Sequence, residues 1–255
     1  MKPFGKRLSD EDIAHLVTYI IVSTEARRDH TSHPATAVLR CGVAYKLAIF
    51  DFDGTLADSF DFFVAAHDTL ARRHGFAELD PARIDEYRGR EPRELIRQYG
   101  IPMWKLPFIA RDFMGMMARH AEGIRLFDGI PEALDWLAAN GVALAIVTSN
   151  SLENVRSVIS NEMIQRIRHI ESGASVFGKR RRIERVLKAS NIARQHAIYV
   201  GDQATDAQAA QAAGIAFGAV RWGYATPAAL ERRSPAMMFD SVAELQNIAK
   251  ASDIQ

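Results

Sequence analysis

Two aspartates that stand two residues apart, Asp51 and Asp53, are the residues of this sequence best suited to do chemistry. They follow an apolar run, residues 47–50, that is typical of a strand buried on both faces. Side chains two apart on an extended chain share a face, and the Gly54 that follows allows a sharp exit from the strand. Two close carboxylates repel each other unless a cation or a proton lies between them. The pair therefore indicates a hard divalent cation, usually magnesium beside a phosphate, and the alternative is a turn whose aspartates only cap a helix.

Polar residues also follow a second predicted strand, residues 142–147. Thr148, Ser149 and Asn150 come directly after it. By itself this triplet favours an ordinary strand-to-helix turn, in which Ser149 or Asn150 is the helix N-cap.

Two more candidate groups lie farther along the chain. Lys179 begins a run of four basic residues at the start of a predicted helix, and we expect the other three on its solvated face. A lysine close to Asp51 would neutralise charge on a phosphoryl group, and electrostatic stabilisation is often the largest catalytic term. The segment from Gly201 through Asp202 to Asp206 follows a third predicted strand, and a capped helix is again the alternative.

In this order, the four groups resemble the motifs of the haloacid dehalogenase superfamily, in particular its phosphoglycolate-phosphatase-like branch. Asp51 to Thr55 matches the Asp-x-Asp-Gly-Thr motif, and Gly201 to Asp206 matches Gly-Asp-x-x-x-Asp. Arg180 stands where many phosphatases of the superfamily have a proline after the lysine. The resemblance extends from Tyr45 to about the C-terminus.

The resemblance implies catalytic roles for three residues. Asp51 would attack phosphorus and form an aspartyl phosphate. Asp53 would protonate the leaving alkoxide and then deprotonate the water that hydrolyses the intermediate. Lys179 would stabilise the charge of the phosphoryl group.

The resemblance also implies a phosphate site and a Mg²⁺ site. Thr148 would bind a phosphate oxygen through its hydroxyl, and Ser149 and Asn150 would assist it. The cation would contact Asp51, the backbone carbonyl of Asp53 and Asp202. The complete predicted metal set is Asp51, Asp53, Asp202 and Asp206, the last from the first or the second coordination shell.

The function implied is hydrolysis of a small phosphorylated metabolite by a magnesium-dependent phosphoric monoester hydrolase. A sugar-phosphate mutase of the same superfamily is one alternative, and a non-catalytic relative that binds a phosphometabolite is another. Asp53 argues against the dehalogenases, which lack the second aspartate. A phosphonate-cleaving enzyme would need a cap lysine for a Schiff base, and Lys105 is the single lysine between residues 59 and 124.

Strands that alternate with helices predict an α/β fold with a doubly wound, Rossmann-like parallel sheet. The predicted strands are residues 47–50, 142–147, 167–170, 197–200, 215–220 and 237–239. The predicted helices are residues 60–74, 91–98, 107–120, 131–140, 151–161, 179–188, 206–213 and 242–250.

Three regions follow from this pattern. Residues 45–58 and 125–255 form the predicted core, and residues 59–124 an inserted all-helical cap. Residues 1–44 are an N-terminal extension with a helix and an irregular segment. In the cap, Arg88 and Arg90 lie where such caps carry a specificity loop, and either could bind a carboxylate or second phosphate of the substrate. Arginines on a solvated surface are the alternative.

Composition narrows the location and the partners. The 255 residues carry a formal net charge of +1, which argues against nucleic acid or an anionic membrane as a partner. One cysteine excludes an internal disulfide framework and favours the cytoplasm. The apolar run at residues 13–22 is too short to cross a bilayer, and acidic residues before it argue against a signal peptide. The expected partner is a small phosphorylated metabolite, and monomer and homodimer stay open.

Overall fold

A six-stranded parallel sheet forms the centre of the chain in the computed structural model, which describes residues 44–78, 80, 99–120, 123–173 and 178–250. Its strands lie in the order β5-β4-β1-β6-β7-β8. Their bounds are β1 Leu47–Phe50, β4 Ala143–Val147, β5 Ile167–Glu171, β6 Ala197–Gly201, β7 Ala216–Val220 and β8 Met237–Phe239. The predicted doubly wound α/β fold is confirmed.

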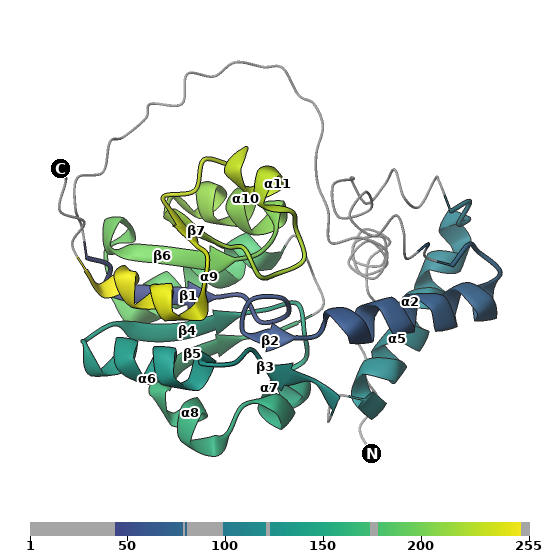
Figure 1. Cartoon of the computed structure of the whole chain (residues 1–255), viewed down its shortest axis with the longest axis horizontal. Helices are drawn as coiled ribbons and strands as arrows, with labels where there is room; N and C mark the ends of the chain where they lie inside the picture. The colour runs from purple at the N-terminus through teal and green to yellow at the C-terminus, as the bar shows by residue number, and fades with distance from the viewer. Residues whose placement is uncertain (1–43, 79, 81–98, 121–122, 174–177, 251–255) are drawn as a thin grey trace.

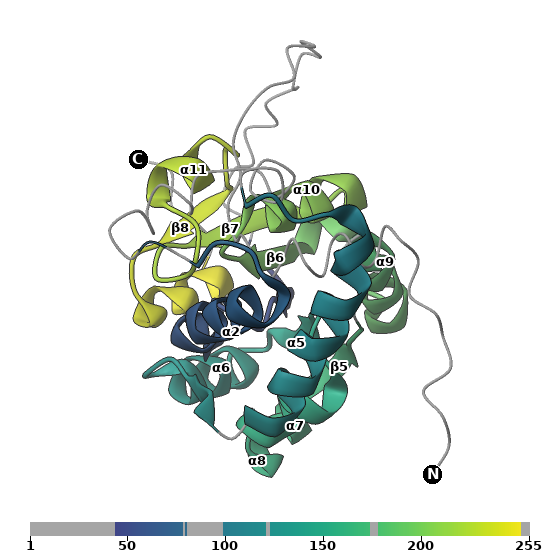
Figure 2. The same ribbon diagram turned by 90° about the vertical axis from the view of Figure 1, so that its right-hand side faces the viewer.

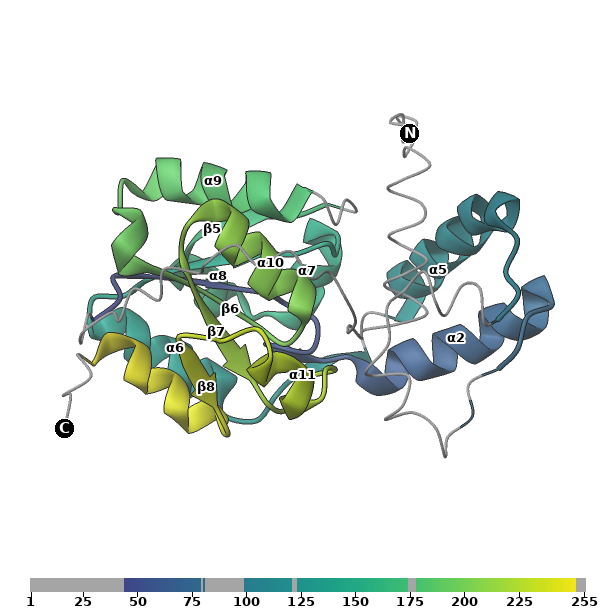
Figure 3. The same cartoon turned by 90° about the horizontal axis from the view of Figure 1, so that it is seen from above.

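Helices cover both faces of this sheet (Figure 3). One face carries α9 (Gly178–Ser190), α10 (Ala204–Ala213) and α11 (Pro227–Glu231), and the other carries α6 (Ile130–Ala139), α7 (Leu152–Val158), α8 (Asn161–Arg166) and the 3₁₀ helix η5 (Val242–Ala249). The strand β1 shows why two layers are needed. Its four residues are all buried, and Leu47 and Ile49 belong to one hydrophobic cluster while Ala48 and Phe50 belong to the other.

Two long helices project away from the sheet (Figure 1) and lie in front of its edge in Figure 2. They are α2 (Phe60–His74) and α5 (Leu106–His120), and the short 3₁₀ helix η2 (Met103–Lys105) precedes α5. The rings of Phe63 and Phe113 join them, with centroids 5.4 Å apart. The helix α2 ends at Gly75, which has the left-handed φ of 69° that glycine adopts without strain.

A two-stranded antiparallel ribbon connects this helical insertion to the sheet. It pairs β2 (Ala57–Asp58) with β3 (Arg125–Leu126). The sequence does not predict it, because two-residue strands are too short to show alternation. The ribbon adjoins both predicted cap boundaries, residues 59 and 124, which stay a prediction.

Two of the predicted helices differ from the structure. The helix expected over residues 151–161 ends at Val158, and an unpredicted helix, α8, follows from Asn161, with Ser160 as its N-cap that accepts a hydrogen bond from the Met163 backbone N–H at 3.3 Å. The last expected helix is 3₁₀ throughout. A third expected helix, residues 91–98, and the extension before residue 44 lie outside the described residues, as do Arg88 and Arg90. None of the described helices is long and apolar enough to span a membrane.

Candidate active site

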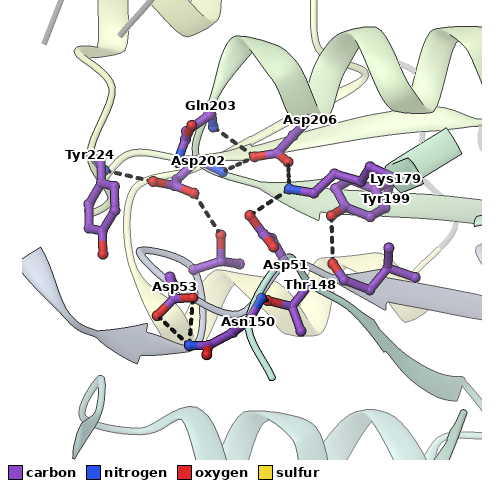
Figure 4. A network of polar contacts seen from close by, with 12 residues as sticks. Asp51, Asp53, Thr148, Asn150, Lys179, Tyr199, Asp202, Gln203, Asp206 and Tyr224 are labelled. Atoms are coloured by element: carbon purple, nitrogen blue, oxygen red, sulfur yellow. Dashed lines mark hydrogen bonds and ion pairs between the residues drawn. The ribbon is translucent and has the colours of Figure 1, made fainter. Parts of the chain in front are cut away.

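Three neighbouring strands end at the candidate site. The strand β1 lies between β4 and β6, and the Asp51 backbone N–H extends the pairing by donating to the Val200 carbonyl at 2.8 Å. Asp51, Thr148 and Asp202 therefore follow strands that are adjacent in space although far apart in sequence. The carboxyl ends of parallel strands in a doubly wound fold are where ligands bind. Figure 4 shows the resulting network, with Asp202, Asp206 and Lys179 above Asp51, and with Asp53 and Asn150 below it.

Lys179 joins two of the predicted carboxylates. Its Nζ donates to Asp51 Oδ2 at 2.9 Å and to Asp206 Oδ1 at 2.6 Å, and all three side chains are buried. The ring of Tyr199 lies 5.7 Å from the same Nζ. This placement agrees with the predicted position of Lys179 beside the nucleophile.

The basic residues after Lys179 divide into two kinds. Arg180 and Arg181 are exposed, as expected of a solvated helix face. Arg182 is buried and donates to the backbone carbonyl of Thr148 at 3.3 Å. The expectation of a solvated face was wrong for Arg182, because it points toward the sheet with the apolar residues of α9.

Asp202 is held by groups from two other loops. Its Oδ1 accepts from Thr55 Oγ1 at 3.1 Å, and its Oδ2 accepts from the Tyr224 backbone N–H at 2.8 Å. Gly54, at a left-handed φ of 75°, passes so close to Asp202 Oδ2 that a Cβ would overlap it. The first-motif glycine is thus required both for the turn and for the close approach of the two loops.

Asp206 is an anchor at the start of α10. Its Oδ2 accepts from the backbone N–H groups of Asp202 (3.1 Å) and Gln203 (2.9 Å), and its Oδ1 accepts from Lys179. The carboxylate therefore caps α10 and orients both Asp202 and Lys179. This combines the helix-cap alternative with the predicted anchoring role.

The buried charges do not balance. Asp51, Asp202 and Asp206 each offer an oxygen within 4.8 Å of the others, and among the described residues Lys179 is the cation that forms ion pairs with them. Burial raises the pKa of Asp51 from 3.8 to about 7; Lys179 opposes this rise, and Asp206 and Asp53 add to it. Burial, with Asp206 and Asp51, raises the pKa of Asp202 well above its usual value. Burial alone would lower the pKa of Lys179, but Asp206 and Asp51 outweigh it and raise that pKa.

The donor set fits a hard divalent cation. Oxygen ligands, excess negative charge and raised carboxylate pKa values are what a site for such a cation presents when a proton is the competing ligand. Asp51 and Asp202 are the two candidates to hold it directly. Asp206 already accepts three hydrogen bonds, which suits an orienting role.

The side chain of Asp53 does not belong to this cluster. Its Oδ1 accepts from Ser59 Oγ at 3.0 Å, and Asn150 Nδ2 donates to Oδ2 at 3.0 Å and to Oδ1 at 3.3 Å. Asp53 is fully buried. The structure therefore separates the two first-motif carboxylates: Asp51 belongs to the acidic cluster, and Asp53 accepts hydrogen bonds from Ser59 and Asn150. A metal contact through the Asp53 backbone carbonyl stays a prediction.

The three residues after β4, Thr148, Ser149 and Asn150, make different contacts. Thr148 is buried, and its Oγ1 accepts from the Asn150 backbone N–H at 2.9 Å. Asn150 holds Asp53. Ser149 is half-buried, and its hydroxyl makes no hydrogen bond within the described part of the chain. The N-cap of α7 is Ser151, whose Oγ accepts from the Asn154 backbone N–H at 3.1 Å, so neither predicted cap was correct.

Two side chains of the site carry no motif signal. Ser59 reaches Asp53, and Tyr224 reaches Ser59, with 2.5 Å between their hydroxyl oxygens. Tyr224 stands 165 residues after Ser59 in sequence. A hydroxyl just before a predicted helix is a clue for Ser59, but that position normally indicates an N-cap.

Comparisons with known proteins agree with this geometry. Residues 48–220 match the family model of the haloacid dehalogenase-like hydrolases. The phosphoglycolate phosphatase of Synechococcus elongatus is 25% identical over 198 residues, which cover 77% of this chain and 93% of the relative. That of Pseudomonas savastanoi pv. phaseolicola is 28% identical over 219 residues, 81% of this chain and 80% of the relative. The fold is shared with a haloacid dehalogenase-like hydrolase of Streptococcus pneumoniae, with a TM-score of 0.66, 22% identity, and coverage of 79% of this chain and 97% of that one.

Proposed function

This chain belongs to the haloacid dehalogenase-like hydrolases and is a phosphatase, a phosphoric monoester hydrolase, and we propose that it is magnesium-dependent and works through an aspartyl phosphate on Asp51. One observation carries the proposal. The Asp51 carboxylate follows β1 at the carboxyl ends of the strands, 2.9 Å from the Nζ of the buried Lys179 and within 4.8 Å of oxygens of the buried Asp202 and Asp206. Such a setting suits a nucleophile that must meet an anionic substrate.

In the first step, Asp51 attacks phosphorus. Lys179 holds Oδ2, which leaves Oδ1 as the attacking oxygen. The bond between phosphorus and the ester oxygen breaks, and Asp53 gives its proton to that oxygen. Thr148 assists by donating a hydrogen bond from its hydroxyl to a phosphoryl oxygen. That hydroxyl accepts a hydrogen bond from the Asn150 backbone N–H and has no acceptor of its own among the described residues.

In the second step, water hydrolyses the aspartyl phosphate. Asp53 takes a proton from the water, the bond between phosphorus and the Asp51 oxygen breaks, and inorganic phosphate leaves. Asp53 is suited to both steps because its surroundings differ from those of Asp51, so the two carboxylates can take separate roles. Lys179 stays charged throughout, because its carboxylate partners raise its pKa.

Mg²⁺ would be held by Asp51 and Asp202, with Asp206 behind them, and would supply charge neutralisation for the phosphoryl group. This chain prepares that site in two ways. The Asp53 side chain lies outside the acidic cluster, and hydrogen bonds from Thr55 Oγ1 and the Tyr224 backbone N–H hold Asp202 in place.

The substrate class we propose is a small alkyl phosphate, with phosphoglycolate the first to test because relatives bear that name. The cap, residues 59–124, would bring Arg88 or Arg90 to the substrate. The phosphonate alternative is disfavoured, because the Lys105 Nζ donates to the His74 carbonyl at 2.6 Å and so caps the end of α2. A cytoplasmic location is part of the proposal.

The test is a panel of phosphate monoesters assayed for free phosphate, with Mg²⁺ and with a chelator. We expect steady phosphate release that needs Mg²⁺, and loss of turnover in Asp51→Asn with the fold retained. Asp58→Asn is the matched control, because Asp58 is an exposed aspartate of the same segment. Isomerised sugar phosphate without phosphate release would instead identify a mutase. Full turnover in Asp51→Asn would refute the mechanism.

A further inference from the structure

Ser59 occupies a helix N-cap without capping the helix. It precedes α2 with φ of −112° and ψ of 7°, and its side chain makes no hydrogen bond to the first turn. A serine at this position usually accepts a backbone N–H there, which stabilises a protein by about 1 kcal/mol. The hydroxyl instead donates to Asp53 at 3.0 Å and lies 2.5 Å from the Tyr224 hydroxyl. Its place in the fold is therefore set by Asp53 and Tyr224.

The direction of these hydrogen bonds follows from counting protons. Ser59 has one hydroxyl proton and donates it to Asp53 Oδ1, which can accept it both when the carboxylate is ionised and when the other oxygen, Oδ2, carries the catalytic proton. The short contact between the two hydroxyls must then use the proton of Tyr224, so Tyr224 donates to Ser59. Burial raises the pKa of Tyr224 well above its usual value, which keeps that proton in place. The result is an ordered chain from Tyr224 through Ser59 to Asp53, in which each bond polarises the next.

Tyr224 is itself fixed from two sides. Its backbone N–H donates to Asp202 at 2.8 Å, and its ring lies 5.5 Å, between centroids, from both Phe60 and Phe63 of α2. Figure 4 shows its backbone at Asp202 and its hydroxyl directed away from that carboxylate. The side chain is buried. Tyr224 thus contacts Asp202, the helix α2 and, through its hydroxyl, Ser59.

From this geometry we infer that Tyr224 is a positioning residue for proton transfer: its hydroxyl orders Ser59, and Ser59 holds the Asp53 carboxylate where it meets the leaving group. The inference rests on the proposed acid–base role of Asp53. Tyr224 does not touch the reacting atoms. Without the Tyr224 hydroxyl, the Ser59 hydroxyl can instead form a hydrogen bond with the first turn of α2.

Leaving-group dependence separates this role from a structural one. An alkyl ester needs a proton on its departing oxygen, whereas p-nitrophenyl phosphate releases a stable anion and does not. The constant kcat/KM reports the steps up to leaving-group departure. We expect Tyr224→Phe to lower kcat/KM at least tenfold for the fastest alkyl ester of the panel, and less than twofold for p-nitrophenyl phosphate. General acid catalysis contributes about 10²–10⁴-fold, so a partial loss of this size is measurable.

Three further single variants and one double variant make the result decisive. Ser59→Ala should reproduce the alkyl-specific loss, and adding Tyr224→Phe to it should cost little more, because both act on one chain of hydrogen bonds. Tyr199→Phe is the matched control: it removes another buried hydroxyl of the site, which donates to the Val147 carbonyl at 3.0 Å, and should affect both esters equally. Asp53→Asn should lose alkyl turnover.

The outcomes distinguish the inference from the proposed function. Full alkyl turnover in Asp53→Asn would overturn the proposed function. Alkyl turnover lost in Asp53→Asn, but equal effects of Tyr224→Phe on both esters or no effect on either, would overturn the inference alone.

Discussion

The substitution Lys179→Met tests the charge balance of the site. It removes the buried lysine that forms ion pairs with Asp51 and Asp206 of the acidic cluster, and it keeps the volume and the unbranched shape of the side chain. Removing one partner of a buried ion pair costs about 3–5 kcal/mol. For a chain of this size, that corresponds to a fall in melting temperature of roughly 6–20 °C. We also expect kcat/KM to fall about 10²–10³-fold.

The pH dependence of that loss is the sharper prediction. An aspartate whose folded-state pKa is raised destabilises the protein progressively as pH rises from its ordinary pKa, 3.8, through the raised value. Without Lys179, the pKa of Asp51 rises above about 7. The additional loss of folding stability therefore appears above pH 7. Each further unit of pKa costs about 1.4 kcal/mol. The stability lost in Lys179→Met should therefore be larger at pH 8 than at pH 5 by at least about 1 kcal/mol.

Urea denaturation followed by circular dichroism, without metal and at both pH values, measures this difference. Lys188→Met is the matched control, because Lys188 lies exposed on the same helix. We expect the control to stay within about 0.5 kcal/mol of the wild type at both pH values. A loss in Lys179→Met that is equal at pH 5 and pH 8, or no larger than in the control, would show that Lys179 does not offset the buried charge of Asp51.

Three further predictions follow from single contacts. Mg²⁺ binding, measured by calorimetry, should weaken at least about tenfold per pH unit below pH 7. The cation must displace the proton from Asp51, whose pKa is about 7, and Asp202 also has a raised pKa; a flat profile between pH 5 and 7 would contradict this. Gly54→Ala should destabilise the protein by about 1–3 kcal/mol and weaken Mg²⁺ binding, because φ is 75° and the new Cβ would displace Asp202; unchanged binding would speak against it. His67 is buried, its Nε2 has no hydrogen-bond partner among the described residues, and burial lowers its pKa. Stability should therefore fall as pH drops below 6.5, where the unfolded chain takes up a proton that the folded chain does not. His67→Phe should flatten that fall in thermal melts between pH 5 and 7, and the same slope in the variant would contradict the assignment.

Three positions of the candidate site were predictable because each follows a strand with a strong local signal. Asp51, Thr148 and Asp202 come after buried apolar runs, and parallel strands bring such ends to one edge. Lys179 was identified from its place in the order of motifs. The ion pairs that it forms with Asp51 and Asp206 agree with that identification.

Contacts between distant segments were not predictable in the same way. The separation of Asp53 from Asp51 depends on Ser59 and Asn150, and no spacing rule fixes which donor a carboxylate will choose. The bond between Ser59 and Tyr224 joins residues 165 apart, one of which stands where a helix cap is expected. Local patterns also miss α8, because the six residues of Asn161–Arg166 are too few to show a helical period.

The aspartyl phosphate on Asp51 is tested most directly by isotope transfer. A single turnover with enzyme in excess, carried out in water enriched in ¹⁸O, is followed by mass spectrometry of the released phosphate and of the peptide that contains Asp51. Attack of Asp51 on phosphorus, followed by attack of water on phosphorus, predicts ¹⁸O in the phosphate and none in the peptide. A phosphoryl group trapped on Asp51 by acid quenching during turnover completes the prediction. Phosphate labelled with ¹⁸O without any detectable phosphoryl group on that peptide, at every quench time, would show direct hydrolysis and contradict the account.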